Sequence, residues 1–193
     1  SHYPNATITG LDLAPGMLAH AQAQYGEAIR WQQGDAAALP LDDASVDLVF
    51  SNLAIQWCPD IGAVMQELAR VLAPSGQARI TTLLPGTLHE VATAWQRPEA
   101  LLQTPDASTV QRAIARSGLR LTHYVREQRR FFYPDLNAVM ASIKGVGAQV
   151  ARPNARLTRQ ALATAQVRYE SLRTPQGLPV SYHCLTLQLE SAR

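Results

Sequence analysis

The sequence predicts an α/β fold, a Rossmann-like sheet of mainly parallel strands with helices on both faces and an antiparallel C-terminal strand. Two observations predict this class. Short β-rich segments alternate with helical segments as far as residue 84, which is the rhythm of a parallel sheet with right-handed crossovers. The segment that starts at Val46 is mainly apolar, as expected for a strand buried on both faces of such a sheet.

The first half of the chain supplies strands and helices in turn. Strands are expected at 6–13, at 29–35, from 46 onward and at 77–84. Pro15 indicates the first turn of a helix between the first two strands. Asp60 is expected to cap a helix that runs to Leu72, and the Pro-Ser-Gly sequence that follows should end it.

The second half is less regular but still alternates. Helices are expected at 87–95, 107–116, 135–144 and 157–173. Strands are expected at 119–133 and 180–189, the second as an antiparallel closing strand. The chain contains no repeat and no sign of a second domain, so residues 1–193 are interpreted as one domain.

Composition excludes several functional classes. The chain has 193 residues, 47% of them hydrophobic, and a net charge of only +2, which gives no indication of a nucleic-acid partner. No apolar run approaches the roughly 20 residues of a membrane helix, and no signal segment is recognisable, so a cytoplasmic protein without membrane contact is expected. Cys58 and Cys184 are far apart without a histidine cluster, which predicts core thiols and no metal site.

Three successive strands end in polar residues. Asp12 and Asp35 end the first two strands, and Asn52 follows the apolar segment of the third. Ligands bind at the carboxyl edge of open α/β sheets, where a carboxylate can accept both hydroxyls of a ribose or the exocyclic amine of adenine. Asp12 could equally cap the next helix, Asp35 could be a turn residue and Asn52 could cap its strand. Together the three indicate a nucleoside pocket.

The motifs around these residues resemble those of class I S-adenosylmethionine-dependent methyltransferases. They are Thr-Gly-Leu-Asp-Leu-Ala-Pro-Gly-Met-Leu at 9–18, Gly-Asp-Ala-Ala-Ala-Leu-Pro at 34–40 and Phe-Ser-Asn-Leu-Ala-Ile-Gln-Trp at 50–57. The last of these is similar in particular to the malonyl-acyl-carrier-protein O-methyltransferases of biotin synthesis. The same family is matched by Thr-Thr-Leu-Leu-Pro-Gly-Thr-Leu-His-Glu at 81–90, Ser-Ile-Lys-Gly-Val-Gly at 142–147, Leu-Thr-Arg-Gln at 157–160 and Val-Ser-Tyr-His at 180–183.

The resemblance implies a site for S-adenosylmethionine. Asp12 would bind the ribose, with Leu13 and Met17 beside the nucleoside. The adenine would be held at the next strand end, and the methionine part and its methyl group at the third. The residues implied there are Asp35 and Ala36, then Asn52 and Leu53.

Two departures from the family pattern affect this expectation. The glycine-rich turn Gly-x-Gly-x-Gly belongs upstream of Ser1, so the first strand and helix of the fold are expected to be missing from an N-terminally truncated domain that binds the cofactor poorly. The connection from Trp95 to Leu101 is shorter than is usual in the family, which would alter part of the substrate wall.

The implied reaction is methylation of the free carboxylate of a malonyl thioester, on an acyl carrier protein or on coenzyme A. That carboxylate is ionised at neutral pH, so no catalytic base is required, and the enzyme mainly has to position it. The candidates for its anchor are Gln56, Lys144, Tyr182 and His183, and Trp57 is expected to be a wall of the acyl pocket or simply a core residue. Lys144 is the only lysine, and could instead be a solvated residue at a helix end, and His183 could be a core histidine.

The densest basic region suits an acidic carrier protein. It comprises Arg112, Arg116, Arg126, Arg129 and Arg130, which could also simply form a solvated surface. Two other functions remain open. The chain could methylate another small molecule, or it could be a catalytically silent interaction domain that lacks the cofactor loop.

Overall fold

The computed structural model describes residues 4–98, 101–145 and 159–193. Its strands form two separate sheets, a four-stranded one and a two-stranded one. In the larger sheet the strand order is β3-β4-β6-β5, with β3 parallel to β4 and the other neighbours antiparallel. The bounds of these strands are Val46–Asn52 for β3, Leu72–Leu83 for β4, Arg120–Tyr133 for β5 and Leu178–Glu190 for β6.

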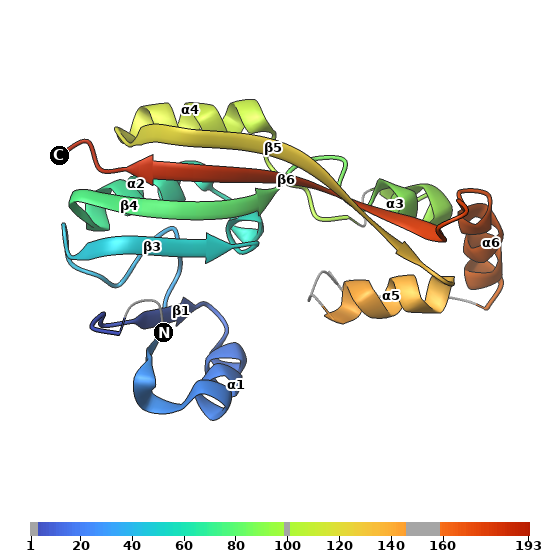
Figure 1. Ribbon diagram of the computed structural model, residues 1–193, viewed down its shortest axis with the longest axis horizontal. Helices are drawn as coiled ribbons and strands as arrows, with labels where there is room; N and C mark the ends of the chain where they lie inside the picture. Colours follow the sequence, from blue (N-terminus) through green and yellow to red (C-terminus); the bar gives the residue numbers. More distant parts are fainter. Residues whose placement is uncertain (1–3, 99–100, 146–158) are drawn as a thin grey trace.

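The smaller sheet lies on the β3 side of the larger one (Figure 1). It pairs β1, Thr9–Asp12, in parallel with β2, Arg30–Gln33, and the helix α1, Pro15–Tyr25, connects the two strands. Within the described residues β1 and β3 do not pair with each other, so each has one free edge.

The prediction that the Val46 strand is buried on both faces is wrong. β3 is an edge strand in the structure, and the side chains of Leu48 and Phe50 are 38% and 75% exposed. The side chains of a strand are buried only where other elements pack beside it and over its faces. Within the described residues, β3 pairs with one strand only, β4.

Two helices pack together on one face of the larger sheet. They are α2, Ile61–Val71, and α4, Ala107–Ser117. Each begins at an aspartate whose carboxylate accepts a backbone N–H three residues on: Asp60 caps α2 at 3.0 Å and Asp106 caps α4 at 2.7 Å. Their apolar residues meet Leu185, Leu187 and Leu189 of β6 in the main core.

A second hydrophobic cluster lies at the far end of the molecule. β5 and β6 extend beyond the larger sheet as a two-stranded ribbon, and three helices gather around its end (Figure 1). Tyr169 is fully buried there and donates its hydroxyl to the Pro179 carbonyl at 2.9 Å. Burial raises the pKa of that hydroxyl well above its usual value, so it stays a proton donor. The helices are α3, His89–Trp95, α5, Leu136–Gly145, and α6, Arg159–Glu170.

The predicted elements agree with the observed ones to within a few residues, except that β4 begins directly after α2. Parts of two sequence motifs, 142–147 and 157–160, and part of the 95–101 connection lie outside the described residues. No helix within the described ranges is long and apolar enough to cross a membrane.

Candidate functional site

The two carboxylates predicted to bind the nucleoside each have one oxygen engaged by the backbone. Asp12 Oδ1 accepts the Ala14 N–H at 2.8 Å, and Asp35 Oδ1 accepts the Ala37 N–H at 2.9 Å. These bonds fix both side chains at the ends of their strands. The second oxygen of each has no hydrogen-bond partner in the described part of the chain, so a turn role and a ligand role are compatible.

Large apolar side chains are exposed beside Asp12. Leu13 is 65% exposed and Met17 is 57% exposed, although both are residues that normally avoid water. A flat, mostly apolar nucleoside could cover them while its hydroxyl groups reach Asp12. The donor set and its apolar surroundings therefore fit the adenosine part of S-adenosylmethionine.

The loop after β2 links the smaller sheet to the main body. Ala36 packs against the main core. Burial, and after it the nearby Asp35 carboxylate, raise the pKa of the Cys58 thiol, which follows β3 in the sequence. The contact of Ala36 with the main core therefore holds the end of the smaller sheet against the main body.

The segment after β3 is held in an unusual conformation by a buried amide. Leu53 adopts a positive φ of 52°, which is uncommon for a residue with a side chain. Its carbonyl accepts Gln56 Nε2 at 2.6 Å, and Gln56 Oε1 accepts the Thr82 hydroxyl at 3.3 Å. Gln56 is only 5% exposed, so both ends of its amide shape the turn that presents Asn52 and Leu53. Its role toward a substrate stays a prediction.

The other predicted substrate residues do not form one cluster. Tyr182 and His183 are consecutive on β6 and therefore point to opposite faces. Tyr182 packs edge-on against Phe131, with ring centroids 5.8 Å apart, and joins the second cluster. Lys144 is exposed at the end of α5, and Trp57 is 43% exposed after β3.

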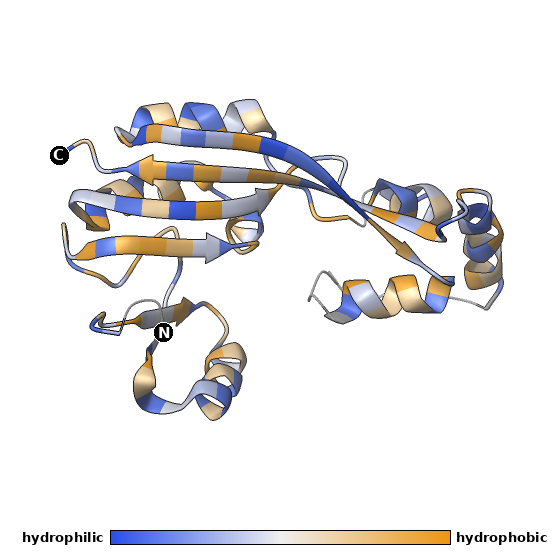
Figure 2. Ribbon diagram, viewed as in Figure 1, coloured by the Kyte–Doolittle hydropathy of each residue, from blue (hydrophilic) through white to orange (hydrophobic). Residues whose placement is uncertain are grey.

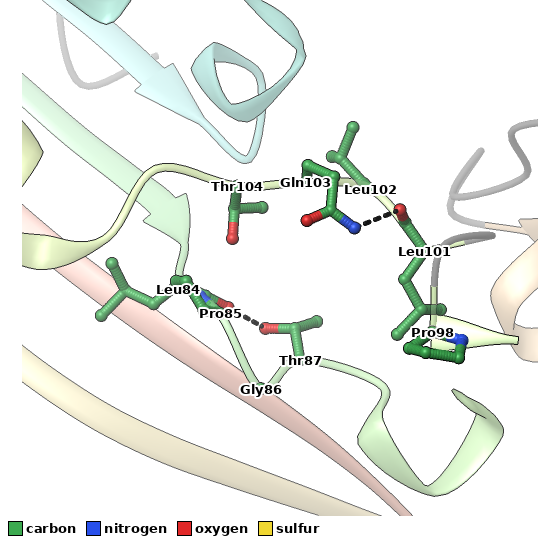
Figure 3. A pocket seen from close by; sticks show the side chains of 9 residues that line it. All are labelled: Leu84, Pro85, Gly86, Thr87, Pro98, Leu101, Leu102, Gln103 and Thr104. Atoms are coloured by element: carbon green, nitrogen blue, oxygen red, sulfur yellow. Dashed lines mark hydrogen bonds between the residues drawn. The ribbon is translucent and has the colours of Figure 1, made fainter. Parts of the chain in front are cut away.

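His183 does not line a cavity itself, but its ring lies against Gly86, which lines a cavity at the carboxyl end of β4. The His183 carbonyl accepts the Leu84 N–H at 2.8 Å, and a Cβ on Gly86 would lie 3.3 Å from the His183 ring. The cavity, of about 180 Å³, is drawn in Figure 3, where the side chains of Thr87, Gln103 and Thr104 are seen around it. Its lining comprises Leu84, Pro85, Gly86, Thr87, Pro98, Leu101, Leu102, Gln103 and Thr104.

A buried acid beside this cavity was not predicted from the sequence. Glu90 of α3 is 4% exposed, and its carboxylate accepts the Ser181 hydroxyl at 2.5 Å and the Ser181 N–H at 3.0 Å. Ser181 Oγ in turn accepts Arg130 Nε at 3.2 Å. Both 81–90 and 180–183 were recognised as motifs, but a pairing across 91 residues leaves no local pattern.

The predicted cofactor residues lie on both sheets. Asp12 ends β1, Leu13 follows it and Met17 lies in α1, whereas Asn52 ends β3 and Leu53 follows it. None of them lines the cavity next to His183, nor a second one of about 360 Å³ at the ends of α2 and α4. The strand ends that are predicted to bind the cofactor are therefore separate from the cavity, which lies one strand further along the sheet.

The fold is the one found in class I S-adenosylmethionine-dependent methyltransferases. A family model described as methyltransferase domain matches residues 1–80. Among solved structures, the YcgJ protein from Bacillus subtilis has a TM-score of 0.64 at 20% identity over 97% of this chain and 83% of its own. Geranyl diphosphate C-methyltransferase from Streptomyces coelicolor, solved with S-adenosyl-L-homocysteine, has a TM-score of 0.55 at 13% identity, over 97% of this chain and 64% of its own.

More similar sequences narrow the class to one family. The malonyl-acyl-carrier-protein O-methyltransferase of Erwinia billingiae is 38% identical over 91% of this chain and 70% of its own length. The biotin biosynthesis bifunctional protein BioHC of Cellvibrio japonicus is 40% identical over 95% of this chain, which spans 38% of that longer protein. The chain belongs to the malonyl-acyl-carrier-protein O-methyltransferase family, as its motifs predicted.

Proposed function

We propose that this chain transfers a methyl group from S-adenosylmethionine to the free carboxylate of a malonyl thioester. The observation that carries the proposal is its 38% identity over 91% of the chain to a relative named for this reaction. The methyl ester would remove the charge of the free carboxylate, so that the malonyl group could serve as a primer for fatty-acid synthesis. The product would be the pimeloyl precursor of biotin. We also propose that the protein acts in the cytoplasm and that residues 1–193 form a single domain.

The residues that we propose for the nucleoside lie at two strand ends, one for the ribose and one for the adenine. Asp12 would accept the ribose hydroxyls through its free oxygen, with Leu13 and Met17 covering the nucleoside. Asp35 would accept the adenine amine, and Ala36 would place it against the main core. When bound, S-adenosylmethionine supplies a methyl group on a positively charged sulfur.

The substrate-binding residues have to position the malonyl carboxylate, and they do not have to transfer a proton. Asn52 and Leu53 would border the reacting groups. The Gln56 side chain holds them in place, because it donates to the Leu53 carbonyl and accepts the Thr82 hydroxyl. His183 supports a substrate role better than Tyr182, since its ring lies beside the cavity. Lys144 and Trp57 remain candidates for the carboxylate anchor and the pocket wall. An ionised carboxylate then needs only correct alignment to attack the methyl group.

The nucleoside site can be tested by titrating S-adenosylhomocysteine into the chain and into a form extended by the family's glycine-rich segment. Binding by either form supports the proposal. Asp12→Asn keeps the bond to Ala14 but loses the charge, and we expect it to weaken binding about tenfold. Asp47→Asn, at an exposed acid of β3, should leave the affinity unchanged. If neither form binds, or if both variants behave alike, the proposal fails.

Methyl transfer is the second measurement. Radiolabelled S-adenosylmethionine with malonyl-acyl carrier protein, and separately with malonyl-coenzyme A, should yield a base-labile methyl ester on the malonyl group. Label on neither thioester, by a form that binds the cofactor, would instead favour another small-molecule substrate or a silent interaction domain.

A further inference from the structure

Two arginines of the edge strand β5 share a face with His183. The register pairs Arg126 with Leu185, Gln128 with His183 and Arg130 with Ser181. Directly opposed residues of antiparallel strands lie on the same face of the sheet, and alternate residues along a strand do so too. Arg126 and Arg130 therefore flank the position of His183 on its own face.

This stretch lies between two helices. On one side, α4 packs in the core that contains Leu185. On the other side, α3 is tied to β6 by the bonds between Glu90 and Ser181. Between them, Gly86 lies against the ring of His183, and the cavity is lined by the segment around it. The two arginines thus border the side of the sheet on which that cavity lies.

The charges on this face are not neutralised by carboxylates at the surface. In the described part of the chain Arg126 has no ion-pair or hydrogen-bond partner, and Arg130 donates only to the Ser181 hydroxyl. The acid behind that hydroxyl, Glu90, is buried. Figure 2 shows the middle of β5 as a continuous hydrophilic stretch.

The opposite face of the same strand differs. Arg129 is paired with Tyr182 in the register and so points away from His183. Its guanidinium forms an ion pair with Glu127 at 2.9 Å, which largely cancels its charge. Among the described residues, β5 therefore presents an unpaired guanidinium, that of Arg126, on the face beside the cavity, and Arg130 lies on the same face.

We propose that the Arg126 and Arg130 face of β5 is the docking surface for the acidic carrier protein that delivers the malonyl thioester. This inference rests on the proposed function and adds the location of its macromolecular partner. A carrier protein presents carboxylates around a phosphodiester-linked arm, and both groups match guanidinium chemistry. Docked here, it would hold its arm next to the His183 cavity. Attraction between such surfaces acts mainly on encounter and weakens as salt is added.

The test measures binding of malonyl-loaded holo-acyl carrier protein to the chain by isothermal titration at low and at moderate salt. We expect Arg126→Glu to weaken binding about tenfold or more at low salt, and the loss to shrink as salt is added. Arg129→Glu is the matched control, since it makes the same charge change one face away, and it should weaken binding less than about threefold. Thermal melts of both variants check that the fold is intact.

Three outcomes overturn the docking surface: no binding by the unchanged chain, equal losses in the two variants, or a larger loss for Arg129→Glu. Malonyl-coenzyme A, which has phosphates but no protein surface, should lose clearly less affinity on Arg126→Glu than the carrier protein does, and a loss of the same size for it would also contradict the inference. Failure of the proposed function shows separately, as absence of S-adenosylhomocysteine binding or of methyl transfer to either thioester.

Discussion

Glu90 shows how a single buried side chain can connect distant parts of this molecule. Its carboxylate receives both the hydroxyl and the N–H of Ser181, and its own helix α3 follows directly from the segment that lines the His183 cavity. An ionised or polar group in such a position is stable only while its hydrogen bonds are made. The contact therefore fixes α3 against β6.

We expect Glu90→Ala to lower the free energy of unfolding by about 2–3 kcal/mol, because it leaves two buried donors of Ser181 unpaired. Glu90→Gln retains an acceptor for one of the two Ser181 donors, so it should lower the free energy of unfolding by less. Denaturant unfolding of both variants measures the difference. An alanine variant as stable as the glutamine variant would mean that water replaces the carboxylate.

Asp106 gives a residue-level prediction with a pH dependence. The N–H of Thr109 and the hydroxyl of Ser108 lower the pKa of its carboxyl from 3.8 to about 2. A carboxylate with a depressed folded-state pKa stabilises the fold above its unfolded pKa, and this contribution disappears as the pH falls toward the folded pKa.

The thermal stability of Asp106→Ala should consequently be lower than that of the unchanged chain at pH 6, and the gap should narrow between about pH 4 and pH 2. Melting curves across this range provide the measurement. Asp106→Asn, which can still cap the helix without titrating, is the control. A gap that stays constant over the range would show that the charge of the carboxylate is irrelevant.

At the scale of elements, α2 is the helix that best illustrates a predicted core face. Its apolar side chains recur at helical spacing and are buried, as expected from the sequence: Ile61, Val64, Met65, Leu68 and Val71. This helix also follows the segment that holds Asn52 and Leu53, so its packing supports the proposed cofactor edge.

Met65 is completely buried. We expect Met65→Ala to lower the free energy of unfolding by about 2–5 kcal/mol, because the cavity that it leaves is not refilled. Gln66→Ala, at the exposed neighbouring position, should change stability by less than about 0.5 kcal/mol. Chemical unfolding distinguishes the two. Similar small effects at both positions would imply that the core around α2 repacks freely.

At the scale of the whole molecule, the free edges of β1 and β3 dominate its expected behaviour. An unpaired strand edge can pair with another chain, and Phe50, 75% exposed on β3, adds an apolar surface to that edge. A chain with this surface is expected to be only moderately stable and to associate as its concentration rises.

Sedimentation velocity at increasing concentration tests this expectation. Phe50→Lys should keep the chain monomeric at concentrations where the unchanged chain associates, because charge on an edge strand opposes pairing. Val167→Lys is a suitable control, as Val167 is 73% exposed but lies on the helix α6, away from every strand edge. Association that persists in Phe50→Lys, or a monomeric unchanged chain, would contradict the role of the edge.

The sequence by itself determined the local features. The order of strands and helices, the cap at Asp60, the alternation along β6 and the polar strand ends depend on residues only a few positions apart. The family motifs belong to this level too. The alternation of Tyr182 and His183 could also have shown that the two cannot face one pocket.

Only the tertiary structure decided which of these side chains are covered, paired or free. It made β3 an edge strand, closed Gln56 inside a turn, joined Glu90 to Ser181 and separated Arg126 from the Arg129–Glu127 pair. The physical reason is that burial and pairing are set by neighbours in space, and those of Glu90 lie 91 residues away along the chain.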